Sequence, residues 1–211
     1  MIKLYGLRMS NYYSLTKAVL IEKGLDFEEI KAPPSQKDDY LARSPMGKMP
    51  SVEIDGTFIS ESLAIVRYAE QIQPEPALLP ADPVAAAKAL ELVMHVKLDA
   101  ELAARRLLPA AMFGATASEE LIDTTHKEVV RGMQAVGALM VCKPYAAGDT
   151  FTLADLYTYY SMGLVTSISE KMFGIDALAD YPQIRDLLAM LAERPSIARV
   201  TEEAAQKKPA T

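Results

Sequence analysis

The sequence predicts an α/β domain at the N-terminus followed by an all-α domain. The first 74 residues mix short β-like runs with helical runs, and the remainder is almost wholly helical and rich in Ala, Leu, Glu and Met. Asp55-Gly56 between two β-like runs is the strongest short signal for a hairpin. We therefore expect an α/β domain over residues 1–74, a linker over 75–83 and an all-helical domain over 84–211.

The expected elements of the first domain follow the order β-α-β-α-β-β-α. This order fits a right-handed βαβ unit followed by a ββα unit. Gly24 is placed to end the first helix, and Ser60 is placed to cap the last one. The expected strands are 2–5, 26–30, 51–54 and 57–59, and the expected helices end near 24, span 37–42 and run to about 72.

The second domain begins with a cap at Asp82 and a proline at the first helical position. We expect one long helix that Pro109 kinks or ends near Gly114. Thr152 and Asp155 have the spacing of a capping box, which places another helix start there. Further helices are expected over 118–142, from 152 towards 169, near 182 and near 195, with a polar tail at 206–211.

Composition excludes several classes of function. A net charge of −6 and a pI of about 5.1 argue against binding to nucleic acid or to an anionic membrane surface. No apolar run approaches the length of a membrane span, which is about 18 residues. The N-terminus does not resemble a signal peptide. Cys142 is the one cysteine, and His95 and His126 are isolated. We expect a cytoplasmic protein without a metal.

The segment Ser10-Asn11 lies between the first strand and the first helix, where small polar residues most often act as caps. The same position suits catalysis, because a helix N-terminus attracts anions. A free thiol has a pKa of about 8.5, and lowering that pKa by about two units requires about 2.7 kcal/mol of stabilisation of the thiolate. One hydrogen bond to a charged acceptor provides about 1.5–3 kcal/mol, and a helix dipole about 0.3–1 kcal/mol. Capping and thiolate stabilisation both remain open.

Two further segments have the same double interpretation. Residues 44–50 form a loop, but Pro50 directly before a strand is unusual. A cis bond there would turn the backbone of Met49 outwards to pair with an extended peptide, and Lys48 can neutralise a carboxylate. Glu61 and Ser62 at a helix start either cap it or hold the ammonium and carboxylate of an amino acid. Together the segments imply a short anionic thiol peptide as ligand.

The run SPMGKMPSVEIDGTFISESLAIVRYAE, with the later box at Thr152 to Asp155, resembles the soluble glutathione transferase superfamily over essentially the whole chain. The resemblance implies a thioredoxin-like domain, an all-helical domain, glutathione as co-substrate and a homodimer. It places Ser10 at the thiolate-activating position of the serine-type classes, with Asn11 as helper. The tyrosine-type position falls near Gly6 and the cysteine-type position near Tyr12, so neither of those types fits.

The resemblance also implies the remaining ligand contacts. Met49 and Pro50 match the backbone-pairing residue and the cis-proline, Glu61 and Ser62 match the γ-glutamyl contacts, and Gln36 lies near the position for the glycine carboxylate. The pocket for the second substrate is expected between the domains. Its candidate walls are Met9, Tyr13, Met112 and Phe113.

Some positions depart from the family or keep a plain interpretation. Ser44-Pro45 replaces the usual Asn-Pro, and the Ser-Ser-Cys signature of the maleylacetoacetate isomerase class is absent. Most methionines are expected to fill the core. His95 and Asp99 are expected on a solvated helix face, with contact to a partner's ligand as the alternative. Cys142 is expected to be buried rather than reactive.

The leading hypothesis is a transferase in which the glutathione thiolate attacks a hydrophobic electrophile. One alternative is glutathione-dependent reduction of disulfides or peroxides, which would use the same binding site. Another is a non-catalytic binding or regulatory protein on the same fold, since fold does not fix function. Neither nucleic acid nor a membrane is expected as a partner.

Overall fold

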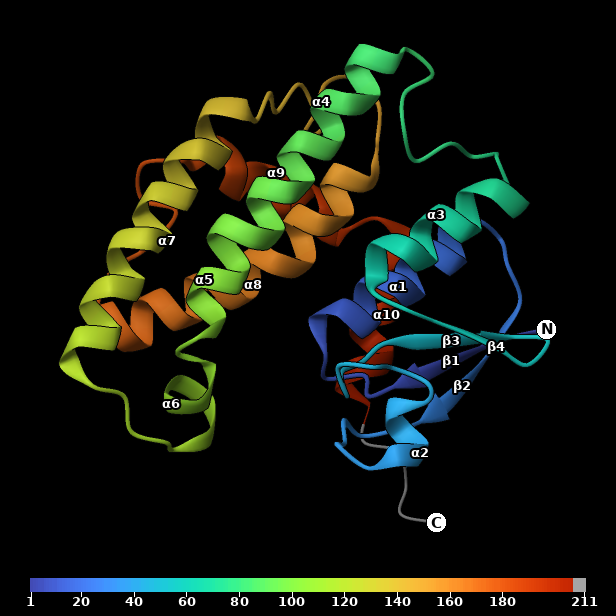
Figure 1. Cartoon of the computed structure of the whole chain (residues 1–211). Helices are drawn as coiled ribbons and strands as arrows, with labels where there is room; N and C mark the ends of the chain where they lie inside the picture. Colours follow the sequence, from blue (N-terminus) through green and yellow to red (C-terminus); the bar gives the residue numbers. More distant parts are fainter. Residues whose placement is uncertain (207–211) are drawn as a thin grey trace. The chain divides into compact units, whose positions relative to one another are not determined.

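The computed structural model describes residues 1–206, and the predicted tail lies outside them from residue 207 onward. The chain divides into two compact units, residues 1–77 with the stretch from residue 193, and residues 78–192 (Figure 1). The sequence placed everything after residue 83 in one helical domain. The C-terminal helix instead packs against the first helix of the chain and so belongs to the first unit.

The first unit is built on a four-stranded sheet of order β2-β1-β3-β4, in which β1 and β2 are parallel and the other pairs antiparallel. Helices α1 and α3 lie over one face of the sheet and α2 lies at the other (Figure 1). This confirms the predicted α/β fold. Its elements are β1 (Ile2–Gly6), α1 (Asn11–Glu22), β2 (Phe27–Lys31), α2 (Asp38–Leu41), β3 (Ser51–Ile54), β4 (Thr57–Ser60), α3 (Ser62–Ile72) and α10 (Pro195–Ala205).

The predicted hairpin joins β3 to β4. Asp55 and Gly56 both have positive φ, 49° and 83°, and Ile54 pairs with Thr57 across the turn. Positive φ at both central residues is what a tight two-residue hairpin requires, which explains the Asp-Gly pair.

The cap of α3 differs from the sequence expectation. Ser60 ends β4, and the N-cap residue is Glu61, whose side chain makes no cap hydrogen bond. Glu61 has φ 70° and ψ 118°, a backbone conformation that is rare and costly for a residue with a side chain. The strand therefore runs directly into the helix through one strained residue.

An ion pair between the N-cap residue of α10 and the last residue of α1 joins the two helices. The guanidinium of Arg194 donates to both carboxylate oxygens of Glu22 over 2.6 and 2.7 Å, and the hydroxyl of Ser196 donates to the same carboxylate. These contacts join residues 172 to 174 positions apart in the chain. They explain why the end of the chain completes the first unit.

The second unit is all-helical, as predicted. The helix α4 starts at Pro83 with Asp82 capping it through the N–H of Ala85, 2.8 Å away. The elements of this unit are α4 (Pro83–Met94), η1 (His95–Glu101), α5 (Leu102–Arg105), α6 (Leu108–Phe113), α7 (Glu119–Leu139), α8 (Leu153–Phe173) and α9 (Pro182–Ala192).

The expected single long helix is interrupted by η1, a π-helical stretch. A new short helix, α6, then starts with Pro109 in its first turn. The wider turn of η1 lies against α7 at Gly132, where an added Cβ would meet the carbonyl oxygen of Asp99 at 2.2 Å. The sequence spacing of Met94, Leu98 and Leu102 could not distinguish this stretch from an ordinary helix.

The capping box of α8 is confirmed. The N–H of Ala154 donates to Thr152 Oγ1 over 3.2 Å, and the N–H of Thr152 donates to Asp155 Oδ2 over 2.8 Å. Phe151 and Leu156, which flank the box, are both buried. Among residues 1–206, no helix combines the length and the apolar character needed to cross a bilayer.

Candidate active site

Ser10 occupies the N-cap of α1. Its Oγ accepts a hydrogen bond from the backbone N–H of Tyr13 over 3.4 Å, and its own N–H donates to the carbonyl of Leu7. The hydroxyl is only partly buried, and the cap uses its oxygen as an acceptor. Its hydrogen therefore stays available to donate to a ligand. Capping and thiolate stabilisation, which the sequence left as alternatives, are compatible at this residue.

The backbone near Ser10 meets the loop before β3 at Gly6. A Cβ added to Gly6 would lie 2.5 Å from Cδ2 of Tyr13 and 3.4 Å from Cβ of Met49. The start of α1 and the loop that carries Met49 therefore come together at the end of β1. The Met49–Pro50 peptide bond is cis, and within residues 1–206 the N–H and C=O of Met49 have no recorded hydrogen-bond partner.

Gln36 lies beside the same loop. Its Nε2 donates to the carbonyl of Met46 over 3.3 Å, and a Cβ added to Gly47, at φ 66°, would lie 2.3 Å from that nitrogen. Lys48 follows directly, is exposed, and has no recorded ion-pair partner among the described residues. Gln36 and Lys48 thus place an amide and an uncompensated ammonium on one loop surface.

Glu61 and Ser62 lie at the start of α3, directly after β4. Glu61 is exposed, and Ser62 is the first helical residue and is buried. A strained backbone residue such as Glu61 costs about 1–3 kcal/mol and is most often found where a site requires it.

Tyr5 does not act as a free phenol. Its hydroxyl donates to Glu53 Oε2 over 2.5 Å, and this hydrogen bond raises the pKa of Tyr5 to about 12. The geometry agrees with the sequence argument that a tyrosine-type site does not fit.

Two family models match the chain. The model described as "Glutathione S-transferase, N-terminal domain" matches residues 4–77, and that described as "Glutathione S-transferase, C-terminal domain" matches residues 116–203. This chain belongs to the glutathione S-transferase family. The first match includes every residue that the sequence assigned to glutathione binding.

Individual relatives agree with the family. The chain is similar to a glutathione S-transferase of Pseudomonas putida strain F1, with 38% identity over 210 residues that cover 100% of this chain and 96% of the relative. It is 27% identical to glutathione S-transferase 1 of Zea mays over 94% of this chain and 95% of that one. A solved glutathione S-transferase from Rhodospirillum rubrum F11 superposes with a TM-score of 0.77 at 25% identity, covering 100% and 96% of the two chains.

Tyr13 does not lie where the sequence placed it. It was expected on the wall of the second-substrate pocket, but its side chain is only 2% exposed. Its hydroxyl donates to Glu29 Oε2 over 2.6 Å, and burial together with this hydrogen bond raises the pKa of Tyr13. The ring therefore belongs to the interior of the first unit and not to the wall of the second-substrate pocket.

The other expected pocket residues are exposed on their own units. Met9 lies next to Ser10 on the first unit and is 74% exposed. Met112 and Phe113 end α6 on the second unit and are 37% and 67% exposed. Lys171 Nζ, from α8, lies 3.2 Å from the sulfur of Met112 and 3.5 Å from the carbonyl of Ala111.

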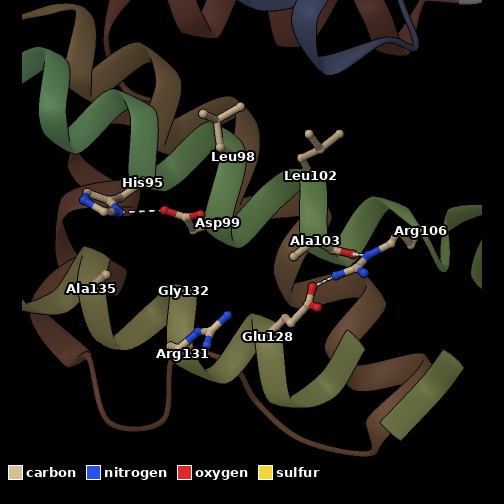
Figure 2. Close-up of a pocket in the computed structure, with 10 residues that line it drawn as sticks. All are labelled: His95, Leu98, Asp99, Leu102, Ala103, Arg106, Glu128, Arg131, Gly132 and Ala135. Atoms are coloured by element: carbon tan, nitrogen blue, oxygen red, sulfur yellow. Dashed lines mark hydrogen bonds and ion pairs between the residues drawn. The ribbon is translucent and has the colours of Figure 1, made fainter. Parts of the chain in front are cut away.

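The second unit contains a groove of about 570 Å³ between η1 and α7 (Figure 2). The ring of His95 points at the carboxylate of Asp99, with 2.6 Å between Nδ1 and Oδ2, and Arg106 pairs with Glu128. Leu98 and Leu102 point away from α7 in this view. None of the residues assigned to glutathione lines the groove. Within residues 1–206 no three His, Cys, Asp or Glu side chains gather as metal ligands.

Sequence reasoning missed a charged cluster beneath α1. Lys17 is 1% exposed and pairs with Glu29 of β2 over 2.8 Å and with Glu203 of α10. The signal was a lysine among the apolar residues Leu15, Ala18 and Val19, because a buried ammonium requires a carboxylate partner. Which carboxylate it meets depends on tertiary contacts that the sequence does not reveal.

Proposed function

We propose that this chain is a glutathione transferase that conjugates the glutathione thiolate to hydrophobic electrophiles. The observation that carries the proposal is Ser10 at the N-cap of α1, with an oxygen that accepts from the helix and a hydrogen that remains to be donated. Membership of the glutathione S-transferase family and the names of its relatives support it.

The chemistry needs no group beyond the helix end and this hydroxyl. A hydrogen bond to a charged sulfur is worth about 1.5–3 kcal/mol, which lowers the pKa of a thiol by one to two. The thiol proton passes to water. The sulfur then attacks the electrophilic carbon, a C–S bond forms, and the leaving group departs with its electron pair. Asn11, the first residue of α1, is proposed as the helper beside the sulfur.

The tripeptide is proposed to lie along the loop and the start of α3. The free backbone of Met49 would pair with the cysteinyl residue, and Lys48 with Gln36 would hold the glycine carboxylate. Glu61 would bind the α-ammonium, while Ser62 and the N-terminus of α3 would bind the α-carboxylate. The strained backbone of Glu61 and the unpaired ammonium of Lys48 support these assignments.

The second substrate is proposed to be apolar. Met9, Met112 and Phe113 expose thioether and aromatic surface that suits an apolar electrophile. A homodimer is also proposed, and light scattering tests it, with an expected mass of twice 23.1 kDa and a contrary result at 23.1 kDa. A cytoplasmic location remains part of the proposal, because a single cysteine suits a reducing compartment.

Three assays separate the proposed function from its alternatives. Retention on immobilised glutathione, turnover of chlorodinitrobenzene and turnover of a glutathione mixed disulfide are measured on one preparation. A transferase is expected to bind the glutathione matrix and to turn over the aryl chloride faster than the mixed disulfide. A faster reaction with the mixed disulfide would favour a reductase, and the absence of binding and turnover would favour a non-catalytic protein.

A further inference from the structure

We propose that Glu29 is a positioning residue for Ser10, and that it acts through Tyr13 and Arg8. The inference rests on the proposed role of Ser10 as the donor to the glutathione sulfur. Glu29 itself lies on β2 and would not contact glutathione. Its role is to hold in place the short loop that carries Ser10.

Glu29 gathers donors from three positions on the first unit. Arg8 donates through Nε and Nη2 over 3.1 and 2.6 Å, Tyr13 through its hydroxyl over 2.6 Å, and Lys17 through Nζ over 2.8 Å. Four hydrogen bonds to one carboxylate leave little freedom for any of these side chains. Arg8 and Tyr13 stand on either side of Ser10 in the chain.

Tyr13 connects the carboxylate to the serine from the helix side. Its backbone N–H is the donor that Ser10 Oγ accepts, and its ring packs against Gly6, where even a Cβ would not fit. A tyrosine fixed at both the ring and the hydroxyl fixes the first turn of α1. The direction of the Ser10 side chain depends on that turn.

Arg8 connects the carboxylate to the serine from the loop side. Its carbonyl accepts the Ser14 hydroxyl over 3.2 Å, and its Nη1 donates to the carbonyl of Glu203 over 3.0 Å. The loop from Leu7 to Ser10 is thus held between β2 and α10. The C-terminal helix therefore takes part in holding the loop, although it lies almost two hundred positions away in the chain.

Two substitutions test the positioning role. Glu29→Gln removes the charge and leaves an amide with fewer acceptor sites, and Tyr13→Phe removes only the phenolic oxygen and keeps the ring on Gly6. Glu22→Gln is the matched control, because Glu22 likewise accepts from an arginine and a hydroxyl group but lies one helix length from Ser10. The pKa of the bound glutathione thiol is read from thiolate absorbance, beside kcat and KM.

Both test variants are expected to raise the pKa of the bound thiol by about one, which lowers kcat about tenfold at a pH below that pKa. Turnover should recover at high pH, where the thiol ionises without help, and the KM for glutathione should stay within about twofold because the peptide contacts are untouched. Glu22→Gln should leave the pKa unchanged. A merely structural role for Glu29 would lower activity equally at every pH.

The outcomes separate this inference from the proposed function. If Ser10→Ala leaves the pKa of the bound thiol unchanged, the role of Ser10 fails and the positioning role fails with it. If Ser10→Ala raises that pKa while Tyr13→Phe does not, only the positioning role is overturned. Tyr13→Phe decides the question even where Glu29→Gln does not fold.

Discussion

The phenol of Tyr13 donates a hydrogen bond to Glu29 Oε2 over 2.6 Å, which turns the tyrosine inward from the surface that carries Ser10. The family resemblance of the sequence had made Tyr13 a candidate wall of the second-substrate pocket. The pairing with Glu29 depends on a parallel strand, β2, that lies after α1 in the chain. It makes the side chain of Tyr13 part of a charged network rather than of the second-substrate pocket.

Glu29 should make the protein sensitive to acid. Burial acts to raise the pKa of Glu29, but hydrogen bonds from Arg8, Lys17 and Tyr13 lower it to about 2. A lowered pKa means that this stability is present above the ordinary value of 4.5 and is lost as pH falls from there towards 2. The contribution is of order 3 kcal/mol.

Urea unfolding at several pH values measures this effect. The free energy of unfolding of the unmodified protein should fall between pH 5 and 2, and that of Glu29→Gln should fall less over the same range. Parallel curves for the two proteins would contradict the assignment.

Asp155 should be the residue of the second unit whose replacement by alanine costs the most stability. It is fully buried and accepts the backbone N–H groups of Ala146 and Thr152 over 2.7 and 2.8 Å. Asp155→Ala leaves two buried donors unpaired, at a cost of about 2–6 kcal/mol. Thermal unfolding measures the loss. Asp149→Ala is the control, because within residues 1–206 that exposed carboxylate accepts a hydrogen bond only from Thr150. Equal losses for the two variants would refute the argument.

Replacing two helical glycines by alanine should change the stability of the protein in opposite directions. A Cβ at Gly132 would meet the Asp99 carbonyl oxygen at 2.2 Å, so Gly132→Ala must push η1 and α7 apart, which we expect to cost about 1–3 kcal/mol. Gly163 in α8 has no atom within 4 Å of the same position, so Gly163→Ala should stabilise by about 0.5–1 kcal/mol. Denaturant midpoints test both, and a neutral Gly132→Ala would show that the helices can separate freely.

Cys142 should be unreactive. Burial, with the nearby charge of Asp155 as a smaller cause, raises the pKa of the Cys142 thiol to about 11. At pH 7 roughly one thiol in ten thousand is then ionised, against roughly three in a hundred for a free thiol. Labelling with iodoacetamide should be far slower than for a small free thiol, and Cys142→Ser should keep full turnover. Rapid labelling of the native protein would contradict this.

Local chemistry explains what the sequence could predict. The Asp55-Gly56 turn, the cap at Asp82 and the box of Thr152 and Asp155 depend on residues within four positions of one another, and all three are confirmed. The cis bond before Pro50, which the family resemblance implied, is also present. Each of these signals has a backbone requirement that few residue types meet.

Tertiary contacts explain what the sequence missed. Glu61 rather than Ser60 caps α3, because pairing in the sheet carries β4 one residue further than expected. The π-helical turn of η1 accompanies the close contact at Gly132, and α10 joins the first unit through Arg194 and Glu22. The deciding partner lies nine positions away for Ser60, which pairs with Ser51, and 33 or more positions away in the other two cases. Helical spacing gives no information about any of these partners.

Titration of glutathione bound to the protein tests the central claim most directly. Thiolate absorbance is followed against pH for the unmodified protein and for Ser10→Ala, each saturated with glutathione. We expect a pKa well below the ordinary value of about 8.5 in the unmodified complex and a rise of one to two in Ser10→Ala, with similar affinity for glutathione. An unshifted pKa in the unmodified complex, or equal values in the two proteins, would contradict the account.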